Sequence, residues 1–233
     1  MSRSVQPIVV HGWSGRRTGD TLDVHAGGMS NHESARPVVP GARTAAARGL
    51  PADLIGADRR GHRLVRADLA RSDLTGARFD GANLRKAVLS GAHAGHASFR
   101  GARLGRADLR GAFLRGADLG SADLSGATLQ DADLTGARLG GANLFGTDLR
   151  GADLTGADLR RVTLEAATLR GAVLCGADLG DSRMATADLR DVVWDAGTRW
   201  PQGVNQPGSA RRADLATPVQ RPAPPPQVTS MRP

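Results

Sequence analysis

Few residues of this 233-residue chain have the type and spacing that catalysis requires. His93 and His96 lie three positions apart, as metal ligands can, but neither a cysteine nor a third histidine accompanies them. Cys175 is the single cysteine, and no base lies beside it to activate a nucleophile. The sequence contains no phosphate-binding loop, serine elbow or zinc motif. We therefore expect no catalytic residue, no cofactor and no metal site, and a protein that is not an enzyme.

A group of basic residues is the better candidate for a binding site. Its members occupy equivalent positions of a twenty-residue period, and no acidic residue occurs at those positions before Asp123. The members are Arg63, Arg66, Arg85, Lys86, Arg103 and Arg106. Such a basic patch suits an anionic partner, although a solvated basic face is the alternative interpretation. Aromatic residues do not interleave with it, so base stacking is not indicated.

A second arginine group differs because acidic residues accompany it. Arg110, Arg150, Arg170 and Arg190 share one position of the period, and Asp108, Asp148 and Asp188 lie two residues before three of them. We expect this group to be charge-compensated. The aspartates that recur through the chain are interpreted as solvated repeat positions rather than paired catalytic carboxylates.

The element that positions these residues is a five-residue repeat. From Ala52 to Ala196 the sequence divides into 29 consecutive pentapeptides without insertion or deletion. One position is leucine in 23 of them, and the position two residues earlier is alanine in 23. Asp or Asn usually lies between these two, and glycine most often lies two residues after the leucine. The repeat predicts a core of alanine and leucine, represented by Leu74, Phe79, Phe99, Leu114, Leu134, Leu154 and Trp194.

A period of five suits neither regular element. On an α-helix successive leucines would step around the cylinder, and on a continuous strand they would alternate between faces. Alanine and leucine two residues apart can share one face, after which the chain must turn a corner, for which glycine is suited. Four sides and four corners close a coil of about twenty residues, and coils stacked at strand spacing of about 4.8 Å pair their backbones.

This pattern resembles the pentapeptide repeat family, whose motif is A(D/N)LXX. The resemblance covers residues 52–196 and implies an all-β fold, a right-handed quadrilateral parallel β-helix of about seven coils. Some members of this family resemble a DNA duplex in width and negative charge and protect type II topoisomerases from inhibitors. The resemblance therefore implies this function as one possibility for the chain. This chain departs from that pattern, because residues 52–200 have 21 basic and 19 acidic residues, a net charge of +2, and carry the basic patch at one end.

The repeat also sets the domain boundaries. Residues 1–51 lack it and are expected to be mostly disordered, with a short capping helix over 42–49 and with Met29 as an alternative start. The β-helix is expected over 52–200, closed by a cap at 193–203 that contains Trp194 and Trp200. Residues 204–233 read as a Pro-rich disordered tail.

Function follows from the filled interior, which leaves only the outer surface for binding. The leading hypothesis is a non-enzymatic, rigid interaction module in the cytoplasm with a macromolecular partner, most simply a protein, and no small-molecule substrate. One alternative is a DNA-mimic protector of DNA gyrase, which would use the second side of the coil, with Asp118, Asp158, Asp178 and Asp181. The other is binding of nucleic acid or an acidic membrane through the basic patch. The sequence does not identify the partner or the oligomeric state.

Overall fold

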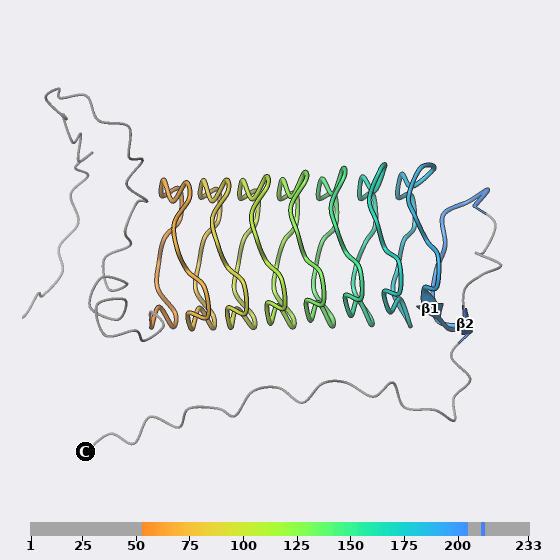
Figure 1. The fold of residues 1–233 in the computed structure, drawn as a ribbon, viewed down its shortest axis with the longest axis horizontal. Coiled ribbons are helices and arrows are strands. Elements are labelled where there is room, and N and C mark those ends of the chain that lie inside the picture. Colours follow the sequence, from red (N-terminus) through yellow and green to blue (C-terminus); the bar gives the residue numbers. More distant parts are fainter. Residues whose placement is uncertain (1–52, 205–210, 213–233) are drawn as a thin grey trace, which may run out of the picture. The chain divides into compact units, whose positions relative to one another are not determined.

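Residues 53–204 wind into a series of coils that lie side by side (Figure 1). In this computed structural model the chain divides into Met1–Ser34 and Ala35–Pro233, and the described residues, 53–204 and 211–212, all belong to the second unit. The expectations for residues 1–51, including the helix over 42–49, lie outside the described residues, as do those for 205–210 and 213–233.

Backbone pairing between coils follows the twenty-residue period that the repeat predicts. Asp53 pairs with Asp73, and Asp73 pairs with His93, always in parallel. The N–H of Leu54 donates to the carbonyl of Asp73 at 2.8 Å, and the same bond recurs coil after coil. We call the four sides of the coil first to fourth, starting at Asp53, Asp58, Arg63 and Asp68.

Each side is too short to form a regular strand. One residue bridges to the next coil before the chain turns, so within residues 53–204 and 211–212 only two strands have more than one residue. They are β1 (Val193–Trp194) and β2 (Arg211–Arg212), which pair in parallel. Arg211 and Arg212 belong to the segment expected to be a disordered tail, and that expectation is wrong for these two residues because their backbone pairs with β1.

A tight turn follows each inward leucine. The N–H of Ala57 donates to the carbonyl of Leu54 at 3.0 Å, and Gly56, the third residue of this turn, has a φ of 62°. Only glycine adopts this left-handed conformation without steric cost, which explains the glycine of the repeat. Within the described repeats, eleven residues other than glycine adopt the left-handed conformation. Each of them loses about 1–2 kcal/mol of stability to the steric cost of this conformation.

Thr186 shows what happens when the turn residue resists this conformation. It is β-branched, which makes a positive φ especially unfavourable, and it is not among the residues with positive φ. In the preceding coil Gly146 donates its N–H to the backbone carbonyl of Glu165 at 3.0 Å. At the next coil the N–H of Ala166 donates instead to the side-chain Oγ1 of Thr186 at 2.9 Å, so the hydroxyl replaces a backbone acceptor.

The interior is filled by the alanine and leucine rows. Six residues representative of the core are fully buried, at 0% exposure: Leu74, Phe79, Phe99, Leu114, Leu134 and Leu154. The rings of Phe79 and Phe99 stack in adjacent coils with centroids 5.1 Å apart. Thr147 takes an alanine position, and its hydroxyl donates to the carbonyl of Leu124 at 2.9 Å. Each buried leucine contributes roughly 1.5–3 kcal/mol to folding.

The last coil departs from the five-residue frame. Arg199 pairs with Asp178, a separation of 21 residues, so one extra residue is accommodated before it. This shift brings Trp200 against the core beside Trp194, with the two rings edge to face at 6.1 Å. Both rings are only partly buried, which fits side chains that cover the end of the stack.

Truncation of a central leucine tests how tightly the interior is packed. We expect Leu134→Ala to lower the free energy of unfolding by about 3–5 kcal/mol, because the neighbouring coils hold the cavity open. Urea unfolding followed by circular dichroism measures the change. Phe145→Ala is the control, since that ring is 53% exposed, and should change stability by less than about 0.5 kcal/mol. A loss below about 1 kcal/mol for Leu134→Ala would contradict a close-packed interior.

Candidate partner-binding surfaces

The aspartates that recur before each inward leucine cap the turns. The carboxylate Oδ1 of Asp148 accepts the backbone N–H of Arg150 at 3.1 Å, and Asn143 accepts that of Phe145 at the same distance. The same bond is made by Asp53, Asp58, Asp68, Asp73, Asn83, Asp108, Asp118, Asp123, Asp133, Asp153, Asp158, Asp178 and Asp188. The interpretation of this column as merely solvated missed that role, although Asp or Asn two residues before a turn N–H is the usual signal for it.

On the fourth side, arginine and aspartate form ion pairs within one coil. Arg150 donates two hydrogen bonds to Asp148, from Nε at 2.9 Å and from Nη2 at 2.6 Å. The pairs Arg110–Asp108 and Arg190–Asp188 have the same arrangement, and Arg170 pairs with Asp191 at 3.2 Å. The expectation that this arginine group is charge-compensated is confirmed.

These pairs keep the carboxylates ionised. The hydrogen bond from Arg150 lowers the pKa of Asp148, and the hydrogen bond from Arg190 lowers the pKa of Asp188 to about 2. A carboxyl group with so low a pKa is a poor general base at neutral pH, because it holds a proton too weakly. The carboxylates of Asp148 and Asp188 are therefore unsuited to act as general bases.

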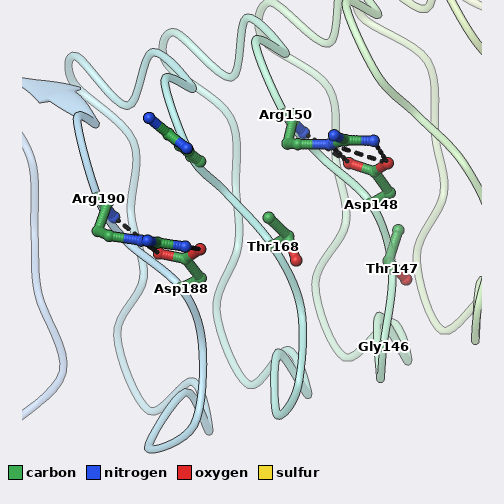
Figure 2. Close-up of a pocket in the computed structure, with 8 residues that line it drawn as sticks. Gly146, Thr147, Asp148, Arg150, Thr168, Asp188 and Arg190 are labelled. Atoms are coloured by element: carbon green, nitrogen blue, oxygen red, sulfur yellow. Dashed lines mark hydrogen bonds and ion pairs between the residues drawn. The ribbon is translucent and has the colours of Figure 1, made fainter.

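A shallow groove crosses the fourth side between two of the pairs (Figure 2). Thr168 lies between the Asp148–Arg150 pair and the Asp188–Arg190 pair. Gly146, Thr147 and Arg170 complete its lining. Its three arginines and both aspartates are already in ion pairs, so the groove offers a ligand no uncompensated charge.

The basic patch lies on the third side. Pairing of Arg63 with Asn83, and of Asn83 with Arg103, stacks these positions in three successive coils. Lys86 and the two arginines in line with it are the third residues of their turns, with φ of 58–59°. All six members of the patch are exposed, and within residues 53–204 none forms an ion pair with a carboxylate.

The arginines beside the patch differ from its members. Arg60, Arg78 and Arg100, which flank it from the second side, pair with Asp58 at 2.6 Å, Asp80 at 4.0 Å and Asp118 at 3.2 Å. The unpaired cations of these three coils are therefore concentrated on the third side, with Arg71 of the fourth side as an exposed exception.

The acidic positions of the second side are largely neutralised. Asp158 pairs with Arg160 at 2.7 Å, Asp178 pairs with Arg199 at 3.5 Å, and Asp118 pairs with Arg100. Of the four carboxylates on which a DNA-like face would depend, three are thus in ion pairs. The second side therefore does not form a continuous acidic surface.

The remaining side chains that could act as metal ligands or nucleophiles do not converge on a site. The rings of His93 and Phe113 stack with centroids 4.8 Å apart. In the part of the chain that the structure describes, no three residues among His, Cys, Asp and Glu are grouped so as to hold a metal ion. Burial, with Asp195 and Asp153, raises the pKa of the Cys175 thiol, so this side chain stays a protonated, weak nucleophile.

The repeated coils and the capping aspartates identify the class of protein. Eight copies of the family described as pentapeptide repeats match residues 52–85, 82–120, 122–161 and 157–193. The chain belongs to the pentapeptide repeat family.

Solved structures of this family are similar to the chain. HetL, from the cyanobacterium Nostoc sp. strain PCC 7120, is involved in heterocyst differentiation regulation; it is 24% identical, with 75% of this chain and 92% of HetL covered and a TM-score of 0.34. QnrB1, a plasmid-mediated fluoroquinolone resistance protein, is 18% identical, with 68% and 90% covered and a TM-score of 0.45. The protein alr5209, from Nostoc PCC 7120, is 41% identical over 42% of this chain and 77% of its own, with a TM-score of 0.24. No curated protein sequence matches the chain.

Among residues 53–204 and 211–212, no helix has the length and apolar character needed to cross a membrane.

The lowered carboxyl pKa values predict that stability falls in acid. Below their ordinary pKa the unfolded chain takes up protons that the folded chain does not, so the free energy of unfolding should be constant from pH 7 to about 5 and fall from about pH 4 towards pH 2. Four of the groups responsible are Asp108, Asp148, Asp158 and Asp188, and the pKa values of Asp58 and Asp195 are lowered as well. Urea midpoints measured at several pH values follow the change.

Asparagine at those four positions separates charge from hydrogen bonding. Asn143 shows that an amide oxygen can also accept the turn N–H. The fourfold variant should therefore fold, with a shallower decline in stability below pH 4. An equally steep decline would show that other groups cause the acid sensitivity.

Proposed function

We propose that this chain is a non-enzymatic interaction module, a right-handed stack of about seven four-sided coils that binds a macromolecular partner through the basic patch. The observation that carries this proposal is the contrast between the patch and every other arginine group described above. In the fourth-side group and in the arginines that flank the patch, arginine is paired with a carboxylate, whereas the six residues of the patch are exposed and have no such pair within residues 53–204.

The filled interior supports an external binding site. Alanine and leucine side chains occupy the inward positions, with exposures of 0–5% across the core. A small-molecule site needs a concavity with converging polar groups, and the groove of the fourth side has its charges already paired. Binding is therefore assigned to the outer columns of side chains.

Uncompensated positive charge favours an anionic partner. An acidic protein, a nucleic acid and an acidic membrane all offer such charge, and each would be attracted over about a Debye length, about 8–10 Å at physiological salt. Protection of DNA gyrase, the alternative implied by the family resemblance, would instead use an acidic face. The ion pairs of Asp118, Asp158 and Asp178 make the second side a weaker basis for it.

Charge reversal tests the role of the patch. We expect a variant with Arg85→Glu, Lys86→Glu, Arg103→Glu and Arg106→Glu to lose the partners that the full chain captures from a cell extract, as identified by mass spectrometry. Arg115→Glu is the matched control, because Arg115 is also exposed but lies on the first side. Capture of the same proteins by the wild type and the charge-reversed variant would overturn the proposal.

A salt titration with a 20-base-pair DNA duplex tests the nucleic-acid alternative. Each phosphate contacted by a cation should contribute about −0.9 to the slope of log K against log salt concentration. Binding with a slope of several units that the charge-reversed variant abolishes would favour nucleic acid over protein.

A further inference from the structure

The third side carries an exposed aromatic residue as well as the basic patch. Phe145 is 53% exposed, one of two large apolar side chains so exposed in the described part of the chain. It follows Asn143, which lies on the third side two coils beyond Arg103. At about 4.8 Å per coil, this places Phe145 about 10 Å along the side from the edge of the patch.

Small residues separate Phe145 from the patch. At the turn position that holds Arg85 and Phe145, Gly105 lies in the coil of Arg103 and Arg106, and Ser125 lies in the one coil between the patch and Phe145. Gly126 stands where the patch has Lys86 and the arginines in line with it. No large side chain stands at these positions between the cations and the ring, so a bound chain segment can reach both.

Phe145 is not required for the fold. Its backbone N–H donates to Oδ1 of Asn143 at 3.1 Å, and its carbonyl accepts the N–H of Gly126 at 2.9 Å. Both bonds use only the backbone of Phe145, so the ring can be removed without loss of either. A single exposed ring is ordinary on a protein surface, so it is its place on the same side as the basic patch that makes Phe145 a candidate contact.

Carboxylates near Phe145 distinguish between kinds of anionic partner. Asp123 lies on the third side one coil before Asn143, and Glu165 lies one coil beyond Phe145. One oxygen of Glu165 pairs with Arg183 at 2.8 Å, while its Oε2 is buried without a hydrogen-bond partner. A phosphate backbone running along this side would be attracted at the patch and repelled beyond it. A protein segment can instead place acidic residues on the patch and an apolar side chain on Phe145.

We propose that the third side docks a protein segment that carries an acidic cluster and, about 10–15 Å further on, an apolar side chain that packs on Phe145. This inference rests on the proposed function and names its partner class. The basic patch supplies attraction and orientation, and the ring supplies the buried anchor that protein interfaces use.

Selection from a phage-displayed library of random 16-residue peptides on the full chain tests the inference. Selected peptides should contain clustered Asp or Glu together with an apolar residue. Fluorescence polarisation then gives the affinity of synthetic versions. We expect Phe145→Ala to weaken binding at least about fivefold, and the fourfold charge reversal to weaken it more.

Two variants serve as matched controls. Ile55→Ala removes the other large exposed apolar side chain, which is 58% exposed and lies on the first side, and Arg115→Glu reverses a charge on that side. Neither should change the affinity. A 20-base-pair duplex and phosphatidylserine vesicles, tested in parallel, should bind more weakly than the peptides and be indifferent to Phe145→Ala.

The outcomes separate this inference from the proposed function. Binding lost on charge reversal but unchanged in Phe145→Ala would overturn the docking of an apolar side chain and leave the basic patch as the site. Tighter binding of the duplex or the vesicles than of any peptide would also overturn the inference. Failure to select any acidic peptide would do the same, and peptide binding indifferent to both sets of changes would overturn both proposals.

Discussion

The structure depends on a constraint of chain geometry: only two residues on each side can point inward before the backbone must turn. Each turn has a residue with positive φ at its third position, with Thr186 as an exception. Because the sides are so short, stability cannot come from long strands and must come from pairing and packing between coils. The coils are bound by regular hydrogen bonds, such as that from Leu54 to Asp73, and by contacts between alanine and leucine rows. Stability in such a stack is a sum of interactions between neighbouring coils.

The same constraint explains why most surface charges serve the fold first. Aspartate before the inward leucine accepts the turn N–H, and arginine two residues later pairs with that aspartate, as Asp148 and Arg150 show. The basic patch arises where this rule is broken. Arg63 and Arg103 occupy positions that usually hold Asp or Asn, so the patch gains two cations and loses two carboxylates. Departure from the repeat is thus what marks this part of the surface as a candidate for binding.

Much of the fold could be predicted because the repeat is nearly unbroken. The period of five predicts the twenty-residue pairing, and the alanine and leucine columns predict the buried rows. What could not be predicted depends on single residues whose effect is local. The extra residue before Arg199 shifts the last pairing, and Thr186 replaces a backbone acceptor by its hydroxyl. The capping role of aspartate was missed because the column was considered for its charge and not for the turn N–H two residues on.

The twenty-residue period predicts that the basic patch lies on one side, but it does not predict that the members of the patch lack ion pairs with carboxylates. Whether Arg78 or Arg100 reaches a carboxylate depends on side-chain conformation, which a repeat does not specify. The repeat does not specify the exposure of Phe145 either. In other coils the same turn position holds residues as different as Gly105 and Arg85. Aromatic residues do not interleave with the patch in the sequence, and only the stacking of the coils brings Phe145 within two coils of it.

Disulfide cross-linking tests the twenty-residue coil most directly. In a Cys175→Ser background, cysteines at Asn143 and Thr163, which pair in adjacent coils, should oxidise readily, because Cα atoms about 4.8 Å apart suit a disulfide. Cysteines at Asn143 and Val173 should not, because these residues lie on opposite sides of the coil. Cross-linking of the second pair, or failure of the first, would contradict the four-sided stack on which the account depends.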